Sequence, residues 1–293
     1  MAILLNKKLE VANKLREEVN FITKLNNNKP HVKVGILNLM PTLEDTERQL
    51  ITVLDAKLLQ VELDFIYLDT KKVELDKKEY YQKYYRPFSE IKNEDYDGII
   101  VTGAPLEHIN YHDIDYIEEL KEFFKYTKSH VKSTCFLCWA SEFALQYFYG
   151  VNRYNLEEKL SGVYEHYIVR KTSLMKGMDD YFLVPQSRYC SIIEGEVMER
   201  KDLILTSKSN ESGPYVLESV DGSKVFLTGH AEYDLYTLDG EYKRDINKGL
   251  AIEPPCNYYK DNDPSKEPVY SWHSTATIIY HNWLYYYVYQ EEM

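Results

Sequence analysis

Short apolar runs alternate with amphipathic stretches through the first half of the chain. Four runs predict buried β-strands, because they are rich in β-branched residues and end at turn-forming residues: residues 31–40, 61–69, 96–105 and 131–137. Strands that alternate with helices in this way predict an α/β fold, with a parallel sheet and helices on both faces. Ligands of such sheets bind outside the carboxyl ends of the strands.

The segments between these strands carry helix signals. Thr42 can cap a helix over residues 42–58, with Asp45 three residues further on as in a capping box. Asp113 can cap a second helix, which has an apolar face made of Ile114, Ile117, Leu120 and Phe124. A third helix is expected over residues 139–150, where the final glycine ends it.

Residues after 150 give a more mixed pattern. Three apolar runs predict a meander of strands that completes the sheet, at 202–208, 214–220 and 224–230. Residues 275–290 predict a terminal helix with one face made of Ile279, Trp283 and Tyr287. The chain is therefore expected to form one domain over residues 1–293, with an N-terminal extension over about residues 1–30.

Composition narrows the possible functions. The net charge of −12 argues against nucleic acid as a partner, because surfaces that bind it are normally basic. The 28 tyrosines could stack on bases, but with this charge they are better interpreted as packing residues. The sequence has no run of ~18 apolar residues and no secretory signal, so a cytoplasmic protein without membrane contact is expected. Four scattered cysteines also fit a reducing compartment.

Cys135 and Cys138 are separated by two residues, a spacing that occurs in redox pairs and metal sites. A thioredoxin-type pair needs its first cysteine exposed at the start of a helix, whereas Cys135 falls inside a predicted strand and points into packing. A metal site needs further ligands, and Cys190 and Cys256 each stand alone. We therefore expect no metal, and we interpret Cys138, at a strand-to-helix turn, as a candidate nucleophile.

A nucleophilic cysteine needs a base, and the base needs a group that orients it. The start of a helix favours a thiolate at Cys138, and the backbone amide of Trp139 would point towards an oxyanion. His230 lies where a strand is expected to end, and Glu232 projects from the same face, so it can orient the imidazole. These three side chains form a possible triad, although the same pattern also fits a packing cysteine and a chance His–Glu pair.

Longer segments resemble one family, the homoserine O-acyltransferases of methionine biosynthesis (homoserine trans-succinylase and transacetylase). The matches run nearly end to end, in GILNLMPTLEDTE, YDGIIVTGAPLEH, STCFLCWASEFAL, EKLSGVYEH, PQSRY, TGHAEYD and SWHSTATIIYHNWLYYYVYQ. The resemblance implies the flavodoxin-like fold of class I glutamine amidotransferases, as a single acyltransferase domain. It also implies a homodimer with no permanently bound cofactor, which uses an acyl-CoA as co-substrate.

By this resemblance Cys138 carries the acyl group in a two-step, ping-pong reaction, with His230 as general base and Glu232 as its partner. Three further residues match positions that contact the amino-acid substrate: Lys159, Ser187 and Arg244. The residue types suit this role, because an arginine can hold an α-carboxylate through two parallel hydrogen bonds. A serine hydroxyl can bind the amino or hydroxyl group as donor or acceptor.

The family divides by acyl donor, and Glu107 resembles the glutamate of one branch where another branch has glycine. A carboxylate here would repel the terminal carboxylate of a succinyl group, so acetyl-CoA is the expected donor and succinyl-CoA the alternative. Four residues depart from the family pattern: Leu43, Gln186, Ala231 and His273. One methylene in a pocket is worth only ~1–3 kcal/mol, so serine stays open as an acceptor, in cysteine biosynthesis instead.

Two other classes of function share parts of this pattern. An amidotransferase or cysteine hydrolase would use the same nucleophile and His–Glu pair, and would release ammonia or pass the acyl group to water. The matches along the whole chain argue against that class. A metabolite-binding relative without catalysis would not need all three triad residues.

Overall fold

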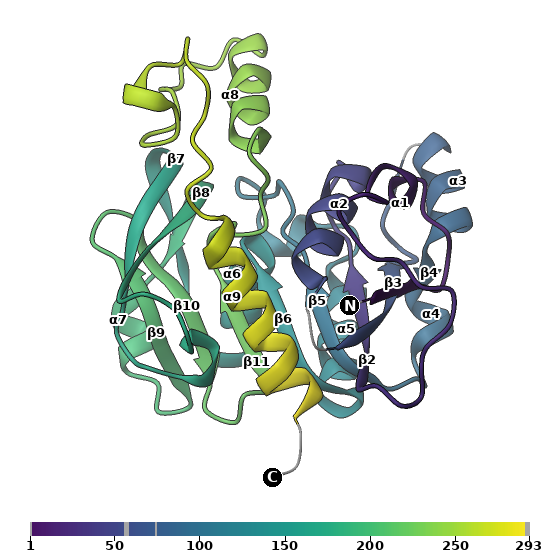
Figure 1. The fold of residues 1–293 in the computed structure, drawn as a ribbon. Helices are drawn as coiled ribbons and strands as arrows, with labels where there is room; N and C mark the ends of the chain where they lie inside the picture. The colour runs from purple at the N-terminus through teal and green to yellow at the C-terminus, as the bar shows by residue number, and fades with distance from the viewer. Residues whose placement is uncertain (1, 56–58, 74, 291–293) are drawn as a thin grey trace.

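One sheet runs through the centre of the molecule (Figure 1). The computed structural model describes residues 2–55, 59–73 and 75–290, and these contain eleven strands in the order β1-β3-β2-β5-β6-β11-β10-β9-β7-β8, with β4 beside β3. The strands are β1 (Ala2–Leu5), β2 (His31–Leu37), β3 (Gln60–Tyr67), β4 (Arg86–Pro87), β5 (Tyr96–Val101), β6 (Val131–Leu137), β7 (Arg153–Ile168), β8 (Tyr181–Ile192), β9 (Leu203–Ser209), β10 (Gly213–Ser219) and β11 (Lys224–Leu227).

Helices cover both faces of this sheet (Figure 1). They are α1 (Val11–Lys14), α2 (Leu43–Leu54), α3 (Leu75–Tyr84), α4 (Phe88–Ile91), α5 (Ile117–His130), α6 (Trp139–Tyr149), α7 (Glu194–Met198), α8 (Thr237–Asn247) and α9 (His273–Asn282), which continues as a π-helix (Trp283–Tyr289). Short 3-10 helices occur at Tyr111–Asp113, Ser173–Met175 and Lys260–Asn262.

The direction of the strands confirms the predicted α/β fold. All neighbours from β1 through β3, β2, β5 and β6 to β11 are parallel. Strand β10 pairs antiparallel with both β11 and β9, which is the predicted meander. Because β11 adjoins β6 in parallel, the end of the meander lies beside the end of the strand that leads to Cys138.

Each face of the sheet has its own hydrophobic core. Leu50 of α2 and Trp283 of the π-helix belong to one core, and Phe124 of α5 belongs to the other. Successive side chains of a strand point to opposite faces, so Cys135 enters the first core and Phe136 the second. Cys135 is 1% exposed, which confirms that it is a packing residue.

Two of the predicted helix starts are wrong in detail. Helix α2 begins directly after Thr42, but the side chain of Thr42 makes no capping hydrogen bond. Asp113 lies in a 3-10 helix and α5 begins at Ile117, because a turn at residues 114–116 separates the two. Helix α2 ends at Leu54, and the predicted residues 56–58 lie outside the described residues.

The end of α6 and the C-terminal helix agree with the sequence pattern. Gly150 adopts a left-handed conformation (φ 71°) and closes α6. The terminal helix extends over the predicted region, with Ile279, Trp283 and Tyr287 all buried.

Two features were not predicted. The long hairpin of β7 and β8 extends the sheet beyond β9 in the region that gave only a mixed pattern. At the opposite edge, Ala2–Leu5 pairs with β3, so part of the expected N-terminal extension lies within the sheet.

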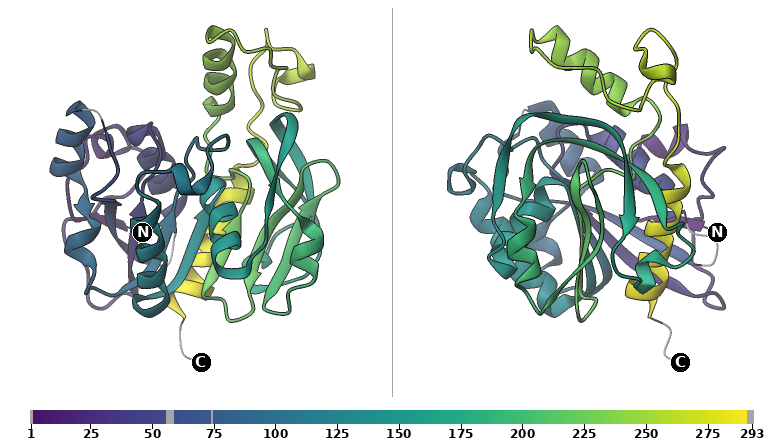
Figure 2. Two further views of the ribbon diagram at one scale, coloured as in Figure 1. Left: turned by 180° about the vertical axis from the view of Figure 1, so that it is seen from behind. Right: turned by 90° about the vertical axis from the view of Figure 1, so that its left-hand side faces the viewer.

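Helix α8 and the chain that returns from it to α9 project above the sheet in every view (Figure 2). They form a small core together with Val163 of β7, and this core includes Leu238, Tyr258 and Trp272.

Candidate active site

Cys138 occupies the sharp turn between β6 and α6. Its backbone has φ 47° and ψ −118°, a conformation that costs energy for any residue except glycine. Two hydrogen bonds hold this turn: the Cys138 amide donates to the Leu227 carbonyl (2.7 Å), and the Glu142 amide donates to the Cys138 carbonyl (3.1 Å). Backbone strain of this kind is concentrated at functional sites, and here it sets the sulfur at the end of the parallel strands.

His230 follows β11 and faces Cys138. Its Nδ1 lies 2.7 Å from Oε1 of Glu232, and Tyr280 donates a hydrogen bond to the other oxygen of that carboxylate (3.2 Å). The ring of Tyr233 stacks on the imidazole, with 4.2 Å between centroids. The imidazole is therefore fixed from two sides, and the predicted cysteine, histidine and glutamate lie together.

Burial and neighbouring charges shift the pKa values of Cys138 and His230 in opposite directions. Burial raises the pKa of the Cys138 thiol, and the hydrogen-bonded His230 opposes that rise only in part. Burial by itself lowers the pKa of His230, but Cys138 and Glu232 together outweigh it, and the pKa is well above its ordinary value. When Cys138 ionises, its proton is therefore held on the imidazole.

Space beside the sulfur is kept open by Gly103, at the end of β5. A Cβ atom at this position would lie 3.2 Å from the Cβ of Cys138 and 3.7 Å from the backbone nitrogen of Trp139. That nitrogen belongs to the first residue of α6, where backbone N–H groups are free to bind an anion. The glycine thus lets the loop after β5 pass close to the Cys138 turn and the predicted oxyanion donor.

A second cluster of polar side chains lies beside the middle and last turn of α8 and contains the three residues predicted to bind an amino acid. Ser187 donates a hydrogen bond to Glu241. Lys159 lies 2.8 Å from Asp245, and the Nη2 of Arg244 also lies 2.8 Å from Asp245. The two carboxylates thus bring Lys159, Ser187 and Arg244 together.

Sequence reasoning missed these carboxylates and the residue that joins them to the triad. Tyr233 stacks on His230 and donates a hydrogen bond to Glu241 (3.0 Å). Glu241 and Asp245 are four positions apart and so lie on one face of α8. The spacing of these two carboxylates can be read from the sequence, but it does not predict that Lys159 pairs with them.

Gln186 and Ala231, two of the four departures from the family pattern, lie close to the triad. Gln186 is buried and accepts a hydrogen bond from Arg188 (3.0 Å), and its amide nitrogen presses against Gly229, the residue before His230. Ala231 is buried between the two triad residues. The other two departures lie at helix starts: Leu43 is buried at the first residue of α2, and His273 is exposed at the first residue of α9.

Glu107 lies in the loop that follows β5. Its charge is close enough to raise the pKa of Cys138, of Glu142 and of Cys190. In each case burial is the larger cause of the rise. The predicted donor-specificity residue therefore acts electrostatically on the nucleophile.

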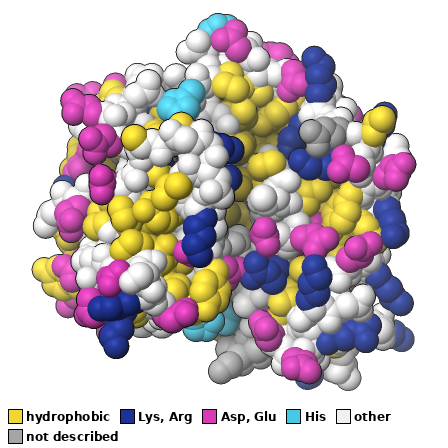
Figure 3. All heavy atoms as spheres, turned by 90° about the horizontal axis from the view of Figure 1, so that it is seen from above, with side chains coloured by type: hydrophobic (Ala, Val, Ile, Leu, Met, Phe, Trp, Pro, Cys, Tyr) yellow, Lys and Arg dark blue, Asp and Glu magenta, His cyan; other side chains and the backbone are white. Residues whose placement is uncertain are grey.

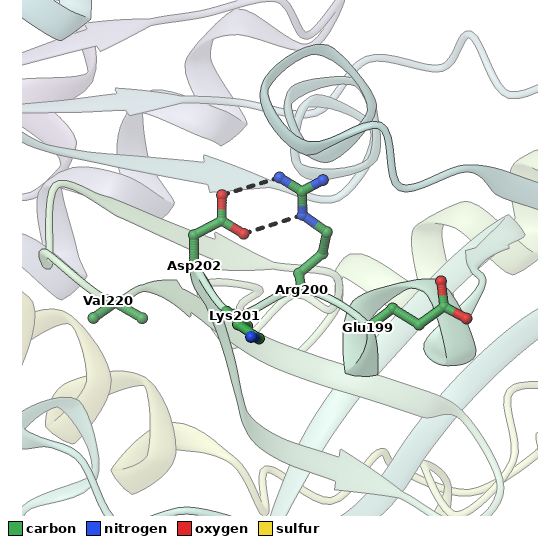
Figure 4. A pocket seen from close by; sticks show the side chains of 5 residues that line it. All are labelled: Glu199, Arg200, Lys201, Asp202 and Val220. Atoms are coloured by element: carbon green, nitrogen blue, oxygen red, sulfur yellow. Dashed lines mark hydrogen bonds and ion pairs between the residues drawn. The ribbon is translucent and has the colours of Figure 1, made fainter.

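The face from which α8 projects is crossed by a furrow where hydrophobic side chains gather, with Lys and Arg side chains along its borders (Figure 3). A separate surface hollow is lined by Glu199, Arg200, Lys201, Asp202 and Val220, and in it Arg200 and Asp202 form a two-point ion pair (Figure 4).

Among the described residues, no three His, Cys, Asp or Glu side chains are grouped to hold a metal ion. No helix in the described part of the chain is long and apolar enough to cross a membrane.

Two solved structures with this fold are named glutamine amidotransferases. The enzyme of Thermotoga maritima superposes with a TM-score of 0.53 and 16% identity, over 89% of this chain and 99% of that one. A glutamine amidotransferase of Methylobacillus flagellatus gives a TM-score of 0.54 and 11% identity, over 90% and 97%. At these identities the likeness concerns the fold, which is that of class I glutamine amidotransferases.

Sequence relatives are much closer. A homoserine O-acetyltransferase of Phocaeicola vulgatus is 42% identical over 261 residues, which cover 89% of this chain and 86% of that protein. A homoserine O-acetyltransferase of Bacillus cereus is 38% identical over 296 residues, covering 99% and 98%. The sequence profile of the family described as "Homoserine O-succinyltransferase" matches residues 2–293. The chain therefore belongs to the homoserine O-succinyltransferase family and is an acyltransferase enzyme.

Proposed function

We propose that this enzyme transfers an acetyl group from acetyl-CoA to the side-chain hydroxyl of L-homoserine, through an acyl-enzyme on Cys138, in methionine biosynthesis. The observation that carries the proposal is the strained turn that holds Cys138 against His230, which Glu232 orients from 2.7 Å. Relatives named homoserine O-acetyltransferase supply the donor and the acceptor. A cytoplasmic location and a homodimer remain predictions from the sequence.

In the first half-reaction the Cys138 thiolate attacks the carbonyl carbon of the thioester. The oxygen gains negative charge and accepts a hydrogen bond from the amide of Trp139, at the start of α6. The bond between the acyl carbon and the coenzyme A sulfur then breaks. Coenzyme A leaves as a thiolate and takes the proton of the His230 imidazolium, so the acyl-enzyme forms beside a neutral imidazole.

In the second half-reaction that imidazole acts as general base. The acceptor hydroxyl attacks the acyl carbon, and its proton passes to His230. The bond to Cys138 breaks, so the product ester leaves and the thiolate–imidazolium pair is restored. Glu232 stabilises the positive charge on His230 and is itself held by Tyr280.

The polar cluster beside α8 suits an amino acid in its zwitterionic form. Its members are Lys159, Ser187, Glu241, Arg244 and Asp245. Glu241 can accept hydrogen bonds from an α-ammonium, while Arg244 and Lys159 can pair with an α-carboxylate. The acceptor would replace the internal pairs that these residues now make with Asp245 and Ser187. Tyr233 connects this cluster to the histidine that must receive the proton.

Glu107 favours an acetyl over a succinyl donor. Its carboxylate already acts on Cys138, so a second carboxylate at the end of a succinyl group would enter a negative field. An acetyl group carries no such charge.

The first test measures coenzyme A release with acetyl-CoA or succinyl-CoA as donor and with homoserine, serine or water as acceptor. We expect acetyl-CoA with homoserine to give the highest kcat/KM, and Glu107→Gly to raise succinyl transfer. Preference for serine would move the enzyme to cysteine biosynthesis. Glutamine hydrolysis, or transfer to water at an equal rate, would contradict the acyltransferase assignment.

The second test concerns the intermediate. Without an acceptor, acetyl-CoA should add the mass of one acetyl group to the protein, on the peptide that contains Cys138. Cys138→Ala should abolish the added mass and the transfer together, whereas Cys190→Ala should retain both. Full transfer by Cys138→Ala would refute the covalent mechanism.

A further inference from the structure

The loop that carries Glu107 depends on its neighbours for its position. Residues 102–110, all of which the structure describes, belong to no helix or strand. The turn itself is closed by short backbone hydrogen bonds, from Leu106 to Ala104 (2.8 Å) and from Ile109 to Leu106 (3.1 Å). On the β8 side, the ring of His108 lies 4.8 Å from that of Tyr189.

Arg153, the first residue of β7, binds this loop at Glu107 and two residues further on. Its Nη2 donates hydrogen bonds to the carbonyl oxygens of Glu107 and Ile109, both at 3.1 Å. Its guanidinium group lies 4.5 Å from the centre of the Tyr111 ring, within range of a cation–π contact. The side chain is 14% exposed, so water screens these contacts only weakly.

The same guanidinium group is tied to the helix that begins at the nucleophile. Its Nη1 lies 3.4 Å from Oε2 of Glu142, whose side chain is 2% exposed. The backbone amide of Glu142 donates to the carbonyl of Cys138 (3.1 Å). One arginine therefore connects the Glu107 loop, through a single carboxylate, to the turn that holds the sulfur.

We propose that Arg153 is a positioning residue that holds the Glu107 loop at a fixed place relative to Cys138 and thereby sets the choice of acyl donor. The inference rests on the proposed role of Glu107 and extends it to a residue outside the acyl pocket. Electrostatic exclusion of a succinyl carboxylate depends on where the Glu107 carboxylate lies, because the repulsion falls with distance and with access to water. If the loop is free to move away, the Glu107 side chain no longer opposes the larger donor.

Lysine cannot reproduce these contacts in full. The arginine fork directs two nitrogen atoms in fixed directions, one towards two carbonyl oxygens and the other towards a carboxylate, while its flat face lies against Tyr111. An ammonium group is one point with three donors on a flexible stem. Arg153→Lys should therefore keep part of the selectivity, and Arg153→Met should lose it.

The experiment compares kcat/KM for acetyl-CoA and for succinyl-CoA at a fixed homoserine concentration. Arg153→Met should lower the acetyl-to-succinyl ratio by about 10- to 100-fold, the loss expected when a reacting geometry shifts by about an ångström, and Arg153→Lys should lie between. The matched control is Arg200→Met, an arginine that pairs with Asp202 in the surface hollow of Figure 4. This control should leave the ratio unchanged.

A double variant separates positioning from general damage. In the Glu107→Gly background, Arg153→Met should change the ratio no further, because the carboxylate that Arg153 positions is gone. Equal loss of activity with both donors in Arg153→Met, with a ratio that Glu107→Gly still changes, would overturn this inference and leave the proposed function intact. A ratio that Glu107→Gly does not change would overturn the proposed role of Glu107 and the inference with it. If Arg153→Met does not fold, the ratio in Arg153→Lys decides in the same way.

Discussion

Glu142 allows the electrostatics beside the nucleophile to be tested through stability. Its side chain lies in the first turn of α6, is 2% exposed and faces Arg153 at 3.4 Å. Burial raises the pKa of this carboxyl from 4.5 to about 7, although Arg188 and Arg153 act to lower it. Glutamine has nearly the same shape and still offers an oxygen to Arg153, so Glu142→Gln removes the titration with little change in packing.

The sign and size follow from proton linkage. Between pH 4.5 and about 7 the folded protein holds a proton at Glu142 that the unfolded chain releases, so stability falls as the pH rises through this window. One unit of pKa corresponds to about 1.4 kcal/mol, which gives a loss of about 3 kcal/mol when the titration is complete. Between pH 5 and pH 8 the loss is about 2–3 kcal/mol, and the glutamine variant lacks this loss because it has no group to titrate.

The assay is urea unfolding at pH 5 and pH 8, followed by the fluorescence of the three tryptophans, all of which are buried. The free energy of unfolding of Glu142→Gln, relative to the unaltered protein, should rise by about 2–3 kcal/mol between these pH values. Glu118→Gln on α5 is the control, because that carboxyl group is 79% exposed and stays in water on folding. A difference for Glu142→Gln that is the same at both pH values would show that the buried carboxyl is already ionised, and would refute the reasoning.

Three further changes test the packing and the hydrogen bonds around the site. Gly103→Ala places a Cβ 3.2 Å from that of Cys138, so coenzyme A release should fall by about 10- to 100-fold. An unchanged rate would mean that the space is not used. Gly98→Ala brings a Cβ to 2.9 Å from the Trp283 ring and should cost about 1–3 kcal/mol in urea unfolding, and an unshifted midpoint would contradict this. Tyr280→Phe removes a donor to the Glu232 carboxylate that orients His230, the proposed general base, so kcat should fall about tenfold while KM for homoserine stays the same. A change in KM alone would place Tyr280 in substrate binding instead.

The sequence predicted the strand-to-helix turn at Cys138 because the signals for it are local. An apolar run followed by a cysteine and an amphipathic segment indicates a strand, a turn and a helix, and β6 and α6 have the expected bounds. What local patterns do not contain is the pairing of β6 with β11, which are far apart in the chain. In the structure Leu137 pairs with Leu227, so Cys138 and His230 lie one and three residues beyond the same rung of the sheet. Hydrophobic periodicity predicted both strands, and the need of a nucleophilic cysteine for a base, together with the resemblance, predicted that their ends meet.

The hairpin of β7 and β8 escaped prediction for a different physical reason. The first half of β7 is largely exposed, and exposed positions follow one another there without the alternation that marks a half-buried strand. Its register with β8 also shifts between Asn155 and Leu160, which breaks any period of two. Two residues of this irregular stretch reach the candidate site. Arg153 binds the loop that carries Glu107, and Lys159 pairs with Asp245 of α8. Irregular backbone next to a site is where local pattern is least informative.

The charges of the polar cluster beside α8 show which residues the resemblance identified and which only the structure revealed. The resemblance pointed to Lys159 and Arg244, two cations, and from them alone the site would attract any small anion. The structure adds Glu241 and Asp245, so the formal charges of the four side chains cancel. A cluster whose charges cancel gains little free energy on binding a simple anion, because one existing ion pair must break for each new ion pair that forms. It gains from a ligand that carries both charges at once, since the ammonium and carboxylate of an amino acid can replace both partners together. We therefore expect the cluster to bind a zwitterion more tightly than a simple anion, because α8 brings both carboxylates to the two cations.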